Sequence, residues 1–205
     1  MPSATQFIAG LFAPNSGVFR YLGPQGDEQT YDIEAQDLAL GAGEVRTVFE
    51  RDGLRISATP VIHANIPALA FRVEVQGKSI VFSGDGNGDN GNLEKIGAGA
   101  NLLVAHLAID DGIHLGARKL HAPPALIGKI AARAKVERPV LSHRRPETLG
   151  KEERLQKAAT QTTSTALRCA AERNGRAYSP TAARSSAALS VFSQENSGSS
   201  RPKCP

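Results

Sequence analysis

The sequence predicts a mixed α/β (α+β) fold, and three observations support this class. Short β-rich runs separated by turn residues occupy residues 44–83. Two further apolar runs of strand type follow at residues 101–105 and 139–143. Between these runs, apolar side chains recur at helical spacing over residues 123–131. A sheet with at least one packed helix is the architecture that such an order of elements favours.

The N-terminal segment, residues 1–43, predicts no stable element. Its apolar stretch at residues 7–12 is followed by Pro14-Asn15-Ser16-Gly17, a typical turn sequence. Residues 26–43 are polar and without periodicity, as in a surface loop or lid. We therefore expect this segment to be irregular.

Residues 44–83 predict a β-meander. Arg51-Asp52-Gly53 and Gln76-Gly77-Lys78 are turn sequences between the β-rich runs. Strands are expected at about residues 68–75 and 79–83. Two strands and a tight turn separate His63 from Asp85, so both side chains can reach one edge of the sheet.

After the meander, the chain alternates between loop, helix and strand. The run DGNGDNGN at residues 85–92 is rich in residues that tolerate positive φ, which predicts a loop. A calcium-binding EF-hand loop is excluded, because its Gly and its closing Glu are replaced by Asn90 and Ile96. A short helix is expected at residues 93–96, and Pro123-Pro124 fit the first turn of the next helix.

The C-terminal segment differs in composition and charge. Residues 148–174 have a weak apolar stripe that permits a helix, although the hydroxyl-rich run 160–165 disfavours it. Residues 175–205 are expected to form a disordered basic tail. Residues 1–143 carry 13 Lys+Arg against 15 Asp+Glu, a net charge of −2, whereas residues 144–205 carry 11 against 5, a net of +6.

The composition also indicates the cellular compartment and the kinds of partner that we expect. No run of eighteen apolar residues occurs, and the first residues lack the pattern of a signal peptide, so we expect a cytoplasmic protein with no membrane partner. Cys169 and Cys204 have no metal-binding spacing and predict no disulfide framework. The arginines of the tail are not interleaved with aromatic residues, so nucleic-acid binding has weak support.

Three residues that follow apolar strands are candidate metal ligands: His63, Asp85 and His143. Strand ends are where α/β proteins usually place their chemistry. Two imidazoles and a carboxylate suit Zn²⁺, and also Mn²⁺ or Fe²⁺. Each residue also has an ordinary structural interpretation, as a strand-end histidine, a turn aspartate and a surface histidine beside basic residues.

The run HANIPALAFRVEVQGKSIVFSGD, followed by LHAPP and LSH, resembles the metallo-β-lactamase superfamily, and most closely its ribonuclease Z-like branch. The resemblance covers about residues 53–145, within an expected domain of residues 44–147. It implies that His63 and His143 are metal ligands and that Asp85 bridges two metals. It also implies that His121 lies beside the metal ligands, where it supports them or relays protons. His106 stands in place of a Glu of that branch and, like His114, is expected to be structural or exposed.

The chain departs from the family in one major respect. The family motif H-x-H-x-D-H, which supplies most of the first metal site, is absent, because no histidine precedes His63. The resemblance therefore implies a partial αββα sandwich, mainly its second half. We expect at most a partly held metal pair, and an apolar sheet surface that drives homo-oligomer formation.

The functional expectation is a metal-dependent hydrolase acting on a phosphodiester or another small-molecule substrate, truncated and impaired as the chain stands. Two alternatives remain open. One is a non-enzymatic interaction module with a basic disordered tail, and the other is a half-site that a partner chain completes.

Overall fold

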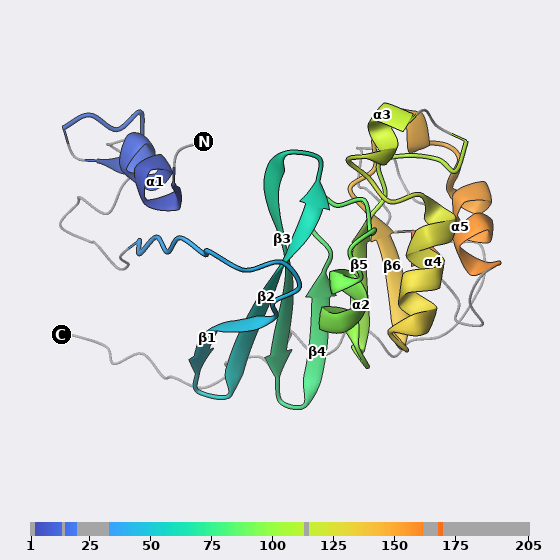
Figure 1. Ribbon diagram of the computed structural model, residues 1–205, viewed down its shortest axis with the longest axis horizontal. Helices are drawn as coiled ribbons and strands as arrows, with labels where there is room; N and C mark the ends of the chain where they lie inside the picture. The colour runs from blue at the N-terminus through green and yellow to red at the C-terminus, as the bar shows by residue number, and fades with distance from the viewer. Residues whose placement is uncertain (1–2, 14, 20–32, 113–114, 162–167, 170–205) are drawn as a thin grey trace, which may run out of the picture. The chain divides into compact units, whose positions relative to one another are not determined.

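The computed structural model describes residues 3–13, 15–19, 33–112, 115–161 and 168–169. In this part of the chain the strands form one seven-stranded sheet, with the strands side by side in chain order (Figure 1). The strands are β1 (Arg46–Arg51), β2 (Leu54–His63), β3 (Ile66–Val75), β4 (Lys78–Phe82), β5 (Leu102–His106), β6 (Arg138–Ser142) and β7 (Arg168–Cys169). The sheet and its helices confirm the predicted mixed α/β class.

Strands β1 to β4 form the predicted antiparallel meander. Tight turns join β1 to β2 and β3 to β4. Asp52 and Gly53 have φ of 51° and 78°, and Gln76 and Gly77 have φ of 50° and 71°. Two successive residues with positive φ are the hallmark of the type I′ turn, whose twist matches that of the paired strands.

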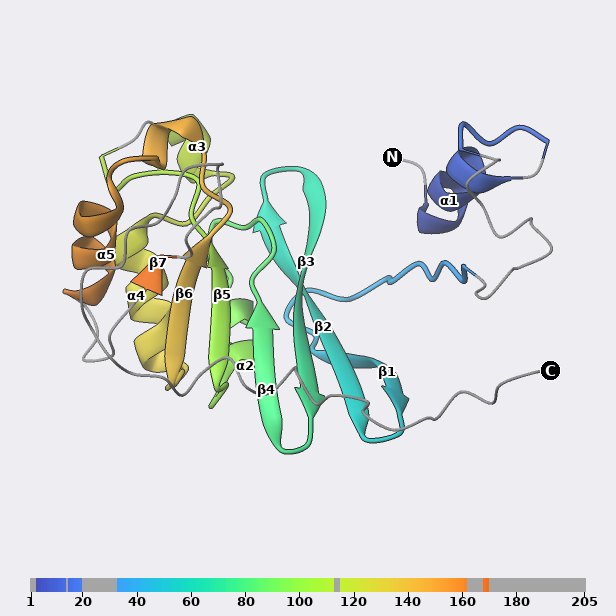
Figure 2. The ribbon, with the colours of Figure 1, turned by 180° about the vertical axis from the view of Figure 1, so that it is seen from behind.

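The sheet becomes parallel from β4 to β7. Helices α2 (Asn92–Gly97) and α4 (Pro124–Arg133) lie on one face of the sheet, in front of it in Figure 1 and behind it in Figure 2. Helix α4 begins at the predicted proline pair, with Pro123 as its N-cap residue. Also after the meander come α3 (Leu115–Arg118), α5 (Glu152–Thr160) and the 3₁₀ turn η1 (Pro146–Thr148).

Strand direction has a consequence for function. Strands β2 and β4 are both antiparallel to β3, so they point the same way, and β5 and β6 are parallel to β4. The carboxyl ends of these four strands therefore meet at one edge of the sheet, where side chains from distant parts of the sequence can converge.

The core between sheet and helices is aliphatic, as the low aromatic content of the chain predicts. It brings the alternate residues of the strands against the buried faces of α2, α4 and α5. Its fully buried large members are Val81, Ile96, Leu103, Leu107, Ile127, Ile130, Leu141 and Leu155. This packing holds the strand ends in fixed positions relative to one another.

Two segments differ from the sequence-based expectation. Helix α1 (Ala4–Phe12) forms in the segment expected to be irregular, because Ser3 and Gln6 make a reciprocal capping box at its start. In the segment expected to permit a helix, residues 148–174, helix α5 ends at Thr160, and Arg168 and Cys169 pair with β6 as a strand. The predicted disordered tail, residues 175–205, lies outside the described residues.

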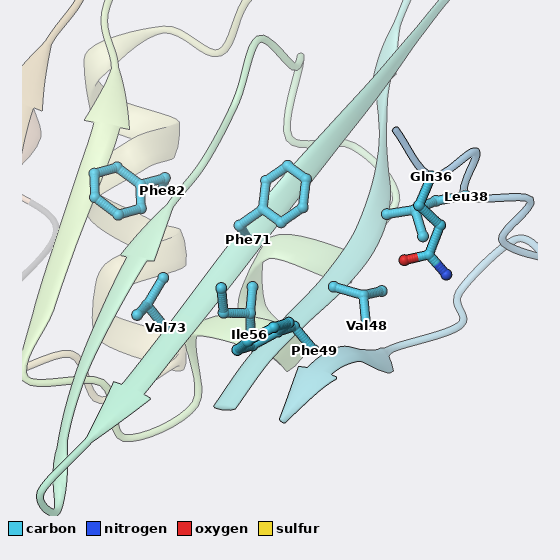
Figure 3. A pocket seen from close by; sticks show the side chains of 8 residues that line it. All are labelled: Gln36, Leu38, Val48, Phe49, Ile56, Phe71, Val73 and Phe82. Carbon is cyan, nitrogen blue, oxygen red and sulfur yellow. The ribbon is translucent and has the colours of Figure 1, made fainter. Parts of the chain in front are cut away.

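The sheet face opposite α2 and α4 carries an apolar groove of about 420 Å³ (Figure 3). Phe82 neighbours Phe71 across the strands β4 and β3, and Ile56 links Val73 to Phe49. Phe49 and Phe82 are 42% and 46% exposed. The predicted apolar sheet surface is thus present in the structure.

Candidate metal centre

Four candidate side chains come from the edge where the parallel-pointing strands end. His63 is the last residue of β2, and His106 is the last residue of β5. Asp85 lies three residues beyond the end of β4, and His143 directly follows β6. The convergence expected from the strand-end positions of His63, Asp85 and His143 therefore has a topological basis, and it brings in His106 as well.

The described residues contain two groups of potential metal ligands, and both include Asp85. One group is His63, Asp85 and His121, and the other is Asp85, His106 and His143. Within each group the ligand atoms all lie within 4.8 Å of one another. His63 and His143 fall in different groups, each with the same carboxylate.

The carboxylate of Asp85 offers one oxygen to each group. Its Oδ2 lies 3.9 Å from Nε2 of His63. Its Oδ1 contacts Nδ1 of His106. A carboxylate with its two oxygens turned toward different imidazoles has the arrangement of a ligand shared by two cations.

His63 is held in an orientation that suits a ligand. Its Nδ1 lies 2.9 Å from the carbonyl oxygen of Leu120, which can only accept a hydrogen bond, so Nδ1 carries the proton and donates. The lone pair is then on Nε2, the nitrogen that faces Asp85. Metal-binding histidines typically show this pattern, with the second ring nitrogen bonded to a carbonyl or carboxylate. The amide of Ala64 also donates to the carbonyl of Lys119, at 3.1 Å.

The segment that receives these hydrogen bonds also carries His121, between α3 and α4. The His121 residue is 6% exposed, and its ring lies 5.1 Å from the rings of both His63 and His106. Burial lowers the pKa of His121; Asp85 opposes this shift, while His63 and Arg145 add to it. The imidazole is therefore neutral at pH 7, with a lone pair available for a proton or a cation.

The sequence did not identify His106 as part of the site, and interpreted it as structural or exposed. Its side chain is only 9% exposed, and it stacks on His121 with 12° between the ring planes. Burial lowers its pKa to about 4, against the opposing charge of Asp85 and with reinforcement from His143. The signal was present in the sequence, because His106 follows an apolar strand just as His143 does. The other histidine with that interpretation, His114, lies outside the described residues.

The loop after β4 positions Asp85 through close backbone packing. Gly84 has φ of +60°, and a Cβ there would lie 2.2 Å from the carbonyl oxygen of Leu69. Only glycine fits both the conformation and the space. The hydroxyl of Ser83 accepts a hydrogen bond of 2.9 Å from the amide of His106, which couples the Asp85 loop to β5.

His143 leaves β6 in the left-handed region, at φ of 50°, which is uncommon for a residue with a side chain. The next residue anchors this turn. The Arg144 side chain is 5% exposed, pairs with Glu152 of α5 and donates to the carbonyl of Thr148 at 3.3 Å. A strained conformation that its surroundings maintain is typical of functional sites.

The residues present fit a divalent cation. Two buried ring nitrogens of the site, His106 Nε2 and His121 Nδ1, have no hydrogen-bond partner. Leaving such atoms unpaired costs about 1–3 kcal/mol each, and a cation would satisfy them. Neutral imidazoles with a carboxylate form a ligand set suited to zinc, manganese or iron.

The structure of the chain is similar to solved structures of known proteins. No family model matches the chain. The structure resembles the metallo-β-lactamase fold protein YhfI from Bacillus subtilis, with a TM-score of 0.55 and 19% identity, over 69% of this chain and 55% of that chain. The short form of human tRNase Z matches with a TM-score of 0.44 and 26% identity, over 50% of this chain and 40% of that one.

One curated protein matches a short stretch of the sequence. Ribonuclease Z of Mycolicibacterium paratuberculosis is 43% identical over 58 residues, which is 28% of this chain and 20% of that protein. The chain thus spans about half of the YhfI structure, and its match covers a fifth of the ribonuclease Z. The likeness to YhfI shows that the chain has part of the metallo-β-lactamase fold.

Proposed function

We propose that the chain is a metal-dependent hydrolase of ribonuclease Z type that cleaves phosphodiesters. The observation that carries this proposal is the pair of ligand groups that share Asp85 at one sheet edge. The sequence likeness to a ribonuclease Z supports the substrate class. His63 and His143 would hold the cations together with Asp85, which would bridge them. Zinc is the cation that we expect, with manganese or iron as alternatives.

A divalent cation bound at such a site lowers the pKa of a water molecule and stabilises charge on a phosphoryl oxygen. The chain's own residues supply the rest. Leu120 holds His63 in the tautomer that directs Nε2 toward Asp85. His121 is the residue to which we assign proton transfer. Its lowered pKa keeps it neutral at pH 7, so it can accept a proton from a nucleophile and pass it on.

We also propose that turnover by this chain alone is slow. The described part of the chain offers four imidazoles and one carboxylate at the site. The H-x-H-x-D-H motif, which supplies most of the first metal site in the family, does not occur in the sequence. A cation with fewer protein ligands binds more weakly and is less well positioned for chemistry.

The test combines metal analysis with a phosphodiesterase assay on the full chain. We would measure zinc content by mass spectrometry and hydrolysis of bis(p-nitrophenyl) phosphate, with and without chelator. Slow, chelator-sensitive hydrolysis that Asp85→Asn abolishes is the expected result. Asp52→Asn is the matched control, because the side chain of Asp52 is 91% exposed, in the β1–β2 turn.

Other outcomes would support different functions. A chain that is stable without metal and shows no hydrolysis contradicts the proposal and supports the interaction-module alternative. Activity that rises more steeply than protein concentration would mean that another chain completes the site. Fast turnover by the isolated chain would contradict only the proposal that its turnover is slow.

A further inference from the structure

His106 occupies the centre of the cluster, at the carboxyl end of β5. This strand lies between β4 and β6, the strands that lead to Asp85 and His143. The register places His106 directly beside Ser142 of β6. Its Nδ1 contacts Asp85 Oδ1, and its ring centroid lies 3.6 Å from that of His143.

The environment of His106 is unfavourable for an ordinary structural histidine. The side chain is 9% exposed, and its Nε2 is buried without a hydrogen-bond partner. The ring centroids of His121 and His143 lie 5.1 and 3.6 Å from that of His106, so three imidazoles are packed together at this point. A bound cation would satisfy the buried Nε2.

We infer that His106 is itself a metal ligand, and that with Asp85 and His143 it forms a complete cation site within this chain. This inference rests on the proposed function, and it extends that function by a ligand that the family resemblance does not supply. Two imidazoles and a carboxylate make three protein ligands, which leaves a coordination position open for water or substrate. The two oxygens of Asp85 keep this site separate from the one at His63.

The alternative role for His106 is purely structural: its Nδ1 would donate a hydrogen bond that orients Asp85. Two substitutions separate the roles. His106→Ala removes both the ligand and the hydrogen bond. His106→Asn retains an amide donor near the position of Nδ1 but removes the imidazole. A positioning role therefore survives in the Asn variant, whereas a ligand role does not.

The experiment is a Co²⁺ titration of the full chain after chelator treatment, followed by visible absorption and equilibrium dialysis. We expect both His106 variants to bind one Co²⁺ fewer than wild type, or to bind it at least about tenfold more weakly, with weaker d–d absorption. Asp52→Asn should bind Co²⁺ as wild type does. Far-UV circular dichroism of the metal-free variants verifies folding, and His106→Asn is the more conservative of the two.

Each result decides the inference. Wild-type binding by His106→Asn would make His106 a positioning residue and overturn the ligand assignment. Unchanged binding by both variants would overturn any role in the metal site, while chelator-sensitive hydrolysis would still support the proposed function. A wild-type chain that binds no Co²⁺ at all would overturn both proposals.

Discussion

At the scale of single residues, the proposed function depends on Asp85 and the imidazoles around it. The carboxylate alone belongs to both ligand groups. His63 reaches it in a defined tautomer, whereas His106 and His121 have buried ring nitrogens without partners. Such a cluster is costly in a metal-free chain, because polar atoms are buried without compensation. A bound cation would offset this cost.

The proton-transfer role that we assign to His121 predicts that catalysis can be lost while metal binding is kept. His121→Gln should lower the rate of metal-dependent phosphodiester hydrolysis by about 100-fold, because it removes the group that transfers protons. Zinc content should stay close to that of wild type. The measurement is kcat together with metal stoichiometry on the same preparation. Loss of zinc in parallel with activity would identify His121 as a ligand instead.

The lowered pKa of His106 predicts acid sensitivity of the metal-free protein. Below pH 6.5 the unfolded chain protonates this imidazole, whereas the folded chain does so only near pH 4. The unfolded state therefore binds more protons in this window, and the free energy of unfolding falls as pH drops, by up to about 1.4 kcal/mol per pH unit. Above pH 6.5 His106 contributes nothing to the change of the free energy of unfolding with pH.

Urea denaturation between pH 8 and pH 5 in the presence of chelator measures this effect. His106→Asn should show a shallower slope below pH 6.5, because the titrating group is gone. Equal slopes for the two proteins would contradict the assignment of the acid sensitivity to His106.

At the scale of elements, the strand directions and the loops after the strands build the site. The antiparallel meander places β2 and β4 in the same direction, and β5 and β6 continue that direction. The connection between α3 and α4 then returns to the same edge with His121. The loop after β4 is fixed by contact between backbones, since Gly84 lies against the carbonyl of Leu69.

A pair of glycine substitutions tests that loop. Gly84→Ala should destabilise the fold by more than the roughly 1–2 kcal/mol expected for a left-handed alanine, since its Cβ would lie 2.2 Å from a backbone oxygen. It should also weaken metal binding through the neighbouring Asp85. Gly53→Ala is the control, because Gly53 also has positive φ, at +78°, but has nothing within 4 Å of the added Cβ. Thermal unfolding and Co²⁺ titration measure both effects, and equal effects of the two substitutions would refute the packing argument.

At the scale of the whole molecule, the two faces of the sheet differ. Helices α2 and α4 cover one face over an aliphatic core. The opposite face holds the apolar groove with Phe49 and Phe82 at its surface (Figure 3). An apolar patch of this kind favours association with another surface. None of the described helices is long and apolar enough to span a membrane.

The groove predicts concentration-dependent self-association. The double variant Phe49→Thr/Phe82→Thr should bind less of a hydrophobic dye and sediment as a smaller species, with an unchanged circular dichroism spectrum. Val81→Thr is the control on the opposite face of β4, where the side chain is 0% exposed; it should destabilise the fold by about 1–3 kcal/mol instead. Sedimentation velocity distinguishes loss of self-association in the double variant from loss of stability in Val81→Thr. Identical sedimentation of wild type and double variant at all concentrations would contradict the prediction.

The sequence by itself determined the class of fold, most of the strands and the start of α4. These follow from local physics: type I′ turn residues, alternating burial and a proline pair at a helix start. It also marked His63, Asp85 and His143 by their positions after strands. Only the tertiary structure decided how they group, with His63 and His143 in different groups that share Asp85, and with His106 and His121 added. The reason is that strand order and direction depend on long-range packing, which no local pattern encodes. Asp85 and His143, which lie beside His106, are 21 and 37 residues away from it along the chain.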